Sequence, residues 1–151
     1  MDAIDRRIIA ALQNDGRLSN VELADLVGLS PSPCLRRVKL LEERGVIAGY
    51  TAVVDRQALG LSLTVFVEIT VARHSRQNAA IVEESLASIP GLVACHMVSG
   101  DADFLVELVV ADLKTYERIL TENILTIDAV EQVRSNFALR TVLTARPLTL
   151  P

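Results

Sequence analysis

Apolar residues recur at two different spacings along this chain, and the spacing changes near residue 60. Before that point they lie three or four residues apart, as on one face of an α-helix, which predicts helices over residues 2–14, 20–27 and 31–44. After it, apolar and polar residues first alternate over residues 63–71, as along a β-strand with one buried face. The pattern therefore predicts a helical domain followed by a mixed α+β domain.

The boundaries of the second and third helices carry clear local signals. Ser19 and Glu22 have the spacing of a capping box, in which the side chain of each residue accepts the backbone N–H of the other. Gly28 is a typical stop, Ser30 can cap the next helix, and Pro31 suits a first helical turn, where no intrahelical donor is needed. Two capped helices separated by a short turn predict a helix-turn-helix.

The third helix has one apolar face, on which Cys34, Val38 and Leu41 fall at 100° per residue, and an opposite side that is basic and polar. A lone helix of this kind is usually a solvated surface helix. After a capped helix and a short turn, however, the pattern favours a helix that reads the major groove, with Arg36 as the candidate for a base edge and the other basic residues as candidates for phosphates. The residues predicted to contact DNA are Ser32, Pro33, Arg36, Arg37 and Lys39.

Two short apolar runs, over residues 46–48 and 51–54, flank Gly49 and Tyr50 and predict a hairpin, or wing, after the third helix. The following stretch contains Gly60 and is the natural linker. The domains expected are a winged helix-turn-helix over residues 1–54, a linker over 55–61 and a second domain over 62–151.

The pattern of apolar residues in the second domain predicts the element order βαββαβ. This is the ferredoxin-like arrangement, an antiparallel sheet with both helices on one face. Its expected elements are a strand over 63–71, a helix from about Ser75, strands over 92–99 and 103–110, a helix containing Leu113 to Ile124, and a strand within 130–145. Helices on one face leave the other uncovered, and Phe66, Val98 and Phe137 are expected there. An exposed apolar patch of this kind predicts a homodimer formed through the sheets.

The charge distribution permits a nucleic-acid partner although the net charge is −4. Residues 1–60 carry eight Lys/Arg and eight Asp/Glu, so the acidic excess lies in the second half. A local basic patch decides where phosphates dock. No apolar run is long enough to span a membrane, and the N-terminus lacks a signal-peptide pattern, so we expect a cytoplasmic protein.

The residues from Asn20 to Tyr50 closely resemble the winged helix-turn-helix of the Lrp/AsnC (feast/famine) transcriptional regulators, and the second half also fits that family. The resemblance rests on Leu-Ser-Pro-Ser-Pro-Cys-Leu-Arg-Arg-Val at 29–38, Leu-Glu-Glu-Arg-Gly-Val-Ile at 41–47, and Gly-Tyr at 49–50. It implies a transcriptional regulator that binds operator DNA and a free amino acid. It also implies homodimers that assemble further, to tetramers or octamers.

The polar segment from Val98 to Asp103 interrupts the apolar strands. By spacing alone it is a hairpin turn in which Gly100 supplies a positive φ. The resemblance implies that this turn is also the family's effector loop, with backbone groups near Gly100, Asp101 and Asp103 facing an α-ammonium group and Ser135 bonding the ligand carboxylate. The expected effector residues are Ser99, Gly100, Asp101, Asp103 and Ser135.

The sequence and the resemblance together predict a sequence-specific DNA-binding regulator in which a free amino acid acts by changing oligomer assembly. We expect no catalytic residues, metal or cofactor, because Cys34 and Cys95 lack metal-like spacing and no nucleophile–base pair is apparent. One rival is an enzyme similar to the sirohaem decarboxylases, which share this two-domain plan, but His74 and His96 are the only histidines. Another is an amino-acid sensor that no longer binds DNA.

Overall fold

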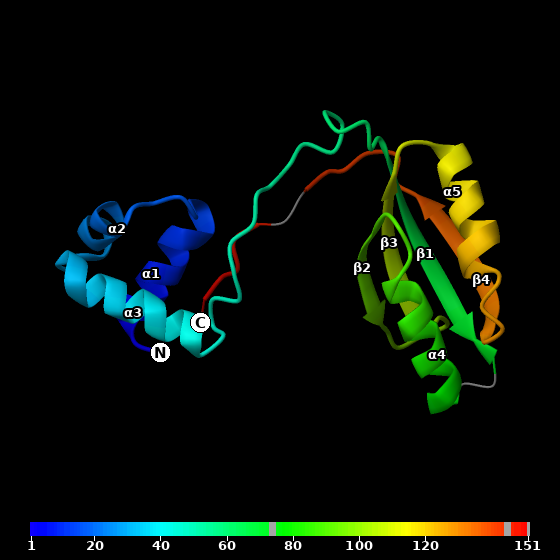
Figure 1. The fold of residues 1–151 in the computed structure, drawn as a ribbon, viewed down its shortest axis with the longest axis horizontal. Helices are drawn as coiled ribbons and strands as arrows, with labels where there is room; N and C mark the ends of the chain where they lie inside the picture. Colours follow the sequence, from blue (N-terminus) through cyan, green and yellow to red (C-terminus); the bar gives the residue numbers. More distant parts are fainter. Residues whose placement is uncertain (73–74, 144–145, 151) are drawn as a thin grey trace. The chain divides into compact units, whose positions relative to one another are not determined.

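The computed structural model describes residues 1–72, 75–143 and 146–150, which form two compact units. The first unit holds residues 1–53 together with the described residues from 142 onward, and the second holds residues 54–141. Each unit has a hydrophobic core of its own. The helical and α+β elements of the two units can be followed along the chain in Figure 1.

The first unit contains the helices α1 (Ala3–Asn14), α2 (Asn20–Val27) and α3 (Pro31–Glu43). Both α1 and α2 begin at a complete capping box, with Asp2 and Ser19 as the N-cap residues. The box at Ser19 was predicted. The one at Asp2 was not, although the acidic residue three positions later is the usual sign of it.

The third helix begins at Pro31, as predicted, but the Ser30 hydroxyl makes no capping hydrogen bond. An N-cap side chain usually accepts the N–H of the second or third helical residue. Here the third is Pro33, which has no N–H to donate. The three helices enclose a small core that includes the predicted apolar face of α3; its buried residues are Ile8, Leu23, Ala24, Val27, Cys34 and Leu41.

The hairpin expected over residues 46–54 is not present. This segment contains no strand. Instead the backbone N–H groups of Val46 and Ile47 donate to the Leu41 carbonyl, and the Tyr50 hydroxyl donates to Glu42 at 3.0 Å. Val53 is 97% exposed. A two-stranded hairpin with no surface packed against it is only marginally stable. The segment after α3 therefore folds back on the end of that helix as a loop.

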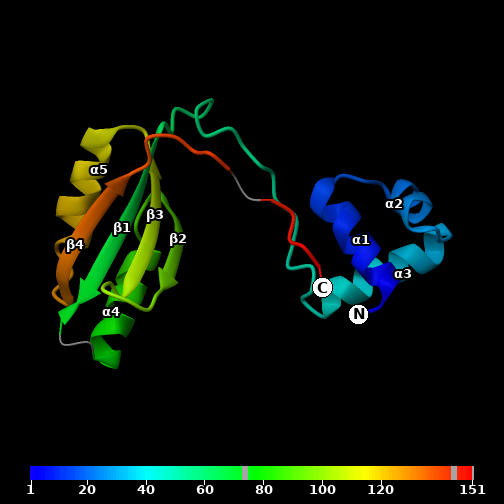
Figure 2. The ribbon, with the colours of Figure 1, turned by 180° about the vertical axis from the view of Figure 1, so that it is seen from behind.

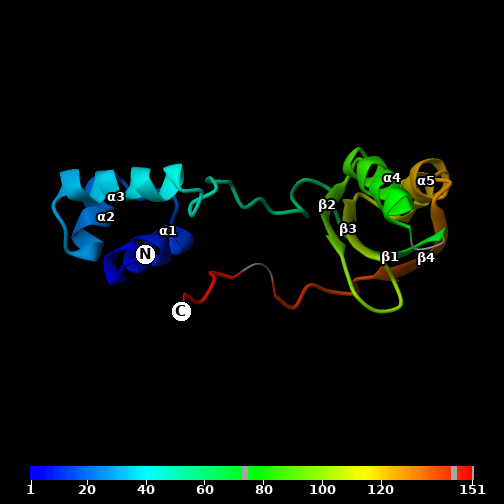
Figure 3. The ribbon, with the colours of Figure 1, turned by 90° about the horizontal axis from the view of Figure 1, so that it is seen from below.

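The second unit is a four-stranded antiparallel sheet with the strand order β2-β3-β1-β4, which can be followed in Figure 2. The strands are β1 (Leu63–Val71), β2 (Leu92–Met97), β3 (Phe104–Val110) and β4 (Val130–Phe137). Figure 3 shows α4 (Arg76–Ala87) and α5 (Leu113–Ile119) on the same side of the sheet. The predicted βαββαβ order is confirmed. The second helix differs from expectation only in continuing past α5 as a π-helical turn, η2 (Leu120–Ile124).

The alternation in β1 sorts its side chains between the two faces of the sheet. Val65, Val67, Ile69 and Val71 are all buried, on the side that the helices cover. The approach to β2 is tightly packed at Gly91, where φ is +81° and an added Cβ would lie 3.0 Å from the Val109 carbonyl oxygen. This backbone conformation and close approach together require glycine.

The uncovered face of the sheet is less apolar than predicted. Phe66 lies on it and is 38% exposed, but Phe137 pairs with Val65 in register and points to the helix side, where its ring meets Tyr116 edge to face. Residues opposite each other in an antiparallel pair share a face, so the register decides this. Polar contacts occupy part of the uncovered face, including the Glu68 carboxylate, which accepts from Asn136 at 3.0 Å.

The segment expected to be a linker is instead an ordered turn of the second unit. The Asp55 carboxylate accepts the N–H groups of Gln57 and Ala58, and Arg56 forms an ion pair with Glu107 on β3 at 2.8 Å. These contacts fix residues 55–61 to the sheet domain rather than leaving them as a flexible connection.

The end of the chain lies with the first unit, not with the sheet domain to which the sequence analysis assigned it. The side-chain amide of Gln13 on α1 donates to the Leu148 carbonyl at 3.2 Å and accepts the Leu148 N–H at 2.6 Å. This pair of hydrogen bonds joins residues 135 positions apart. Local patterning carries no signal for a contact at that separation.

Candidate DNA-binding and effector sites

The outer face of α3 presents the predicted polar and basic side chains to solvent. Ser32, Arg36 and Lys39 are exposed and lie three or four positions apart, so they share one face of the helix. Pro33 is half-buried at the side of that face. The opposite face is fixed by Cys34 and Leu41, which are buried in the helical core. Burial of the apolar face thus orients the basic face outward.

Two features hold the start of α3 in place against α2. Gly28 ends α2 in the left-handed conformation, with φ of 70°, which allows the chain to turn within three residues. The Asn20 side-chain amide, at the first turn of α2, then donates to the Pro31 carbonyl at 2.8 Å. Sequence reasoning placed Asn20 in the helix but did not identify this bond. This bond therefore joins the first turn of α2 to the first turn of α3.

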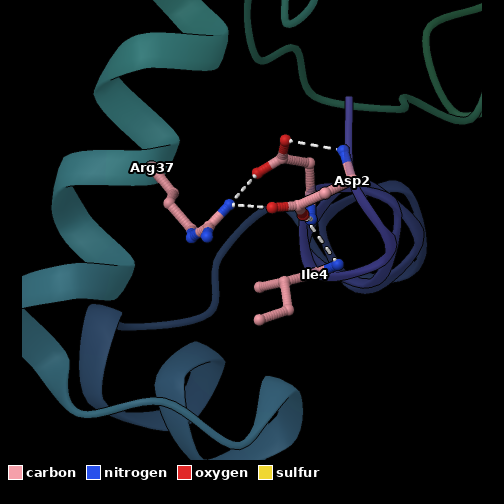
Figure 4. Close-up of polar contacts among 4 residues, drawn as sticks. Asp2, Ile4 and Arg37 are labelled. Atoms are coloured by element: carbon pink, nitrogen blue, oxygen red, sulfur yellow. Dashed lines mark hydrogen bonds and ion pairs between the residues drawn. The ribbon is translucent and has the colours of Figure 1, made fainter.

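Arg37 is held in a contact that differs from its predicted role. Its guanidinium donates to the carboxylate of Asp2, the N-cap of α1, as Figure 4 shows, and to that of Asp5 in the first turn of α1, each at 2.7 Å. The side chain is only about one-third exposed. These ion pairs join the first helix to the third and neutralise a charge that the sequence assigned to a phosphate. Of the three basic side chains predicted to contact DNA, Arg36 and Lys39 are exposed.

Acid is expected to weaken the contact between α1 and α3. The pKa of Asp2 is held below its ordinary value of 3.8, first by the Asp5 backbone N–H that its carboxylate accepts and then by Arg37. Because the folded state favours the ionised form, this stabilisation is complete above the ordinary pKa and is lost as the pH falls through the lower folded value.

The variant Asp2→Asn tests this, because asparagine can still cap the helix but carries no charge. Its melting temperature should lie below that of the unaltered protein near neutral pH, and the two should converge in acid below about pH 4. Circular dichroism melts over a pH series measure the difference. A gap that stays constant down to low pH would contradict the assignment to charge.

The loop between β2 and β3 contains four of the five predicted effector residues. Ser99, Gly100 and Asp101 are exposed, and Gly100 has φ of +129°, so the turn role expected from spacing is present. Asp103 is placed differently: one of its carboxylate oxygens accepts the Val71 backbone N–H at 2.7 Å. Asp103 therefore joins the loop to the end of β1 as well as lying beside the candidate effector site.

Ser135 lies apart from that loop in a single chain. It is half-buried opposite Val67 on β4, and its hydroxyl is hydrogen-bonded to that of Tyr116. Asp103 lies just before β3, beside the end of β1. From Ser135 it is three residues along the strands and two strands across the sheet, a separation of roughly 14 Å at about 3.3 Å per residue and 4.8 Å per strand. The structure thus does not bring the predicted effector residues of one chain into a single pocket.

Neither cysteine resembles an activated thiolate. Burial raises the pKa of the Cys34 thiol, and burial together with Glu83 raises that of Cys95. Among the described residues, no group of three or more His, Cys, Asp or Glu side chains is placed to hold a metal ion. His74 lies outside the described residues. No helix in the described part of the chain combines the length and apolarity that crossing a membrane needs.

Comparison with known proteins agrees with both halves of this geometry. A family model for winged helix-turn-helix DNA binding matches residues 1–48, and one for the Lrp/AsnC ligand-binding domain matches residues 64–148. The leucine-responsive regulatory protein of Escherichia coli K12 is 41% identical over 150 residues, which cover 99% of this chain and 92% of that protein. The chain belongs to the Lrp/AsnC family.

Solved structures share the Lrp/AsnC architecture along the whole chain. A transcriptional regulator from Neisseria meningitidis in complex with L-Met has a TM-score of 0.93 at 30% identity, covering 99% of this chain and 96% of that one. An AsnC family regulator from Agrobacterium tumefaciens has a TM-score of 0.91 at 36% identity, covering 100% and 97%. These relatives are transcriptional regulators, which confirms that this Lrp/AsnC protein is a DNA-binding regulator and not an enzyme.

Proposed function

We propose that this Lrp/AsnC protein recognises specific DNA sequences with the outer face of α3. The observation that carries the proposal is the exposure of Ser32, Arg36 and Lys39 on one face of a helix whose other face is buried. Arg36 suits a bidentate contact to a guanine edge, and Lys39 suits a phosphate. Arg37 acts instead as an internal tie to α1, which keeps the reading face in position.

The proposed effector is a free amino acid with an apolar side chain. Support comes from the relatives, one named leucine-responsive and another solved with L-Met. In this chain the exposed carboxylate of Asp101 suits an α-ammonium group, and the hydroxyl of Ser135 suits a carboxylate. Because these residues lie apart in one chain, we propose that the pocket is completed where two subunits meet.

The proposed mechanism is linkage between effector binding and assembly. A ligand held between subunits shifts an oligomeric equilibrium only by its different affinity for the two assemblies. A homodimer formed through the sheet face that carries Phe66 would present two α3 helices to two half-sites, and tetramers or octamers of such units would engage neighbouring sites together. A cytoplasmic location follows from this function.

Selection from a random DNA library tests the DNA-binding proposal. The protein should enrich a two-fold symmetric sequence whose half-sites lie about one helical turn apart. Enrichment of no sequence over the starting library would contradict it. A thermal-shift screen with the twenty amino acids tests the effector, because a ligand that binds only the folded state raises its melting temperature.

The Asp101 carboxylate is expected to bind the effector without supporting the fold. Asp101→Asn should weaken amino-acid binding about tenfold or more, as expected for loss of a charge-assisted hydrogen bond, and leave the melting temperature of the free protein unchanged. Isothermal titration calorimetry measures the affinity. Asp128→Asn, at another exposed acidic position of the same domain, is the matched control.

Equal binding by Asp101→Asn and the unaltered protein would overturn the effector-loop assignment. Asp103 is a poorer probe, because removing its carboxylate leaves the buried Val71 N–H without this acceptor and so disturbs the end of β1.

A further inference from the structure

Two leucines flank the basic face of α3 and are exposed to solvent. Leu35 is 44% exposed and Leu40 is 41% exposed. Leu35 lies three positions after Ser32 and four before Lys39, so its side chain adjoins both of theirs on the helix surface. Both leucines line the same shallow depression as Arg36 and Lys39. The surface proposed to enter the groove is therefore basic with apolar sides.

An apolar side chain on such a surface has one complementary group on the base edges of the major groove. Those edges present hydrogen-bond donors and acceptors, and the C5-methyl group of thymine is the apolar exception. A leucine facing a donor or acceptor would remove water from it without replacing the hydrogen bond. A leucine facing the methyl group buries apolar surface on both partners.

We propose that Leu35 recognises the methyl group of a thymine that neighbours the base contacted by Arg36. This inference rests on the proposed DNA-binding function and specifies part of the sequence that is bound. It makes Leu35 a specificity-determining residue that acts through apolar contact, beside the hydrogen bonds of Arg36.

Leu35 rather than Leu40 has this role because of its place along the helix. It lies in the second turn of α3, and the N-terminal turns of a recognition helix approach the bases. Leu40 lies near the opposite end, three residues before the exposed Glu43, whose charge repels phosphates. The two leucines have the same chemistry and nearly the same exposure, so they form a matched pair.

Replacement of thymine by uracil tests the proposal on the unaltered protein, since uracil keeps the base pairing and lacks only the methyl group. In the operator obtained by selection, each thymine is replaced in turn and the affinity measured by fluorescence anisotropy. One thymine in each half-site should show a loss of about three- to fivefold on losing its methyl group. Leu35→Ala should bind the thymine and uracil operators equally, and Leu40→Ala should keep the preference for thymine.

Three results would overturn the proposal: no thymine whose methyl group matters, a preference that survives in Leu35→Ala, or one that is lost equally in Leu40→Ala. A melting curve shows whether Leu35→Ala is folded, and Leu35→Met, which retains an apolar side chain, supplies a second variant that should keep the preference. Failure of the unaltered protein to select any sequence contradicts the proposed function itself, so the two failures are distinguishable.

Discussion

Replacing Arg36 by alanine is expected to weaken binding to the selected operator by about 1–3 kcal/mol, a loss of roughly five- to 150-fold. The guanidinium is exposed on the outer face of α3, so its removal takes away a base contact without opening the helical core. The melting temperature and the oligomeric state should be unchanged. Fluorescence anisotropy at one fixed salt concentration measures the affinity, with a scrambled duplex alongside for non-specific binding.

Two other arginines of the first unit supply the controls for that measurement. Arg17→Ala removes an exposed positive charge that lies before α2 and should change specific binding little. Arg37→Ala breaks the ion pairs with Asp2 and Asp5 and should lower the melting temperature. If Arg36→Ala weakens binding to the operator and to the scrambled duplex by the same factor, Arg36 contacts a phosphate and the assignment to a base edge is wrong.

Phe104→Ala is expected to cost about 3–5 kcal/mol of the free energy of unfolding, because it leaves a large cavity in a packed core. Phe104 is 1% exposed at the start of β3, where it pairs with Ile69 on β1 and Met97 on β2. Urea denaturation followed by circular dichroism gives the change. The helical unit has a core of its own, so it should stay folded at the lower urea concentrations that unfold the sheet unit of this variant. Its part of the helical circular dichroism signal should therefore be retained there.

Phe66→Ala is the matched control, since Phe66 lies on the uncovered face of the same sheet. Its loss should change the stability of the single chain much less than the loss of Phe104. If the sheets associate through this face, it should also weaken dimerisation in analytical ultracentrifugation. Equal destabilisation by the two variants would contradict the assignment of these phenylalanines to opposite faces.

The sequence alone predicted most of the elements that depend on neighbours a few residues away. The three helices of the first unit follow from apolar residues at helical spacing, and the capping box at Ser19 marks the start of α2. The alternation in β1 and the order of the later elements predicted the sheet with its two helices. The exposed face of α3, with Ser32, Arg36 and Lys39, also follows from helical periodicity alone.

The tertiary structure alone decided which partners distant residues find. The pairing of β1 with β4 turns Phe137 toward the helices, and the packing of α1 against α3 places two carboxylates beside Arg37. The hairpin predicted after α3 does not form, because a two-stranded hairpin is stable only when it has a surface to pack against. The bonds between Gln13 and Leu148 join positions that no local pattern connects. Periodicity fixes the face on which a side chain lies within its own element, whereas its partner depends on strand register and helix packing across the fold.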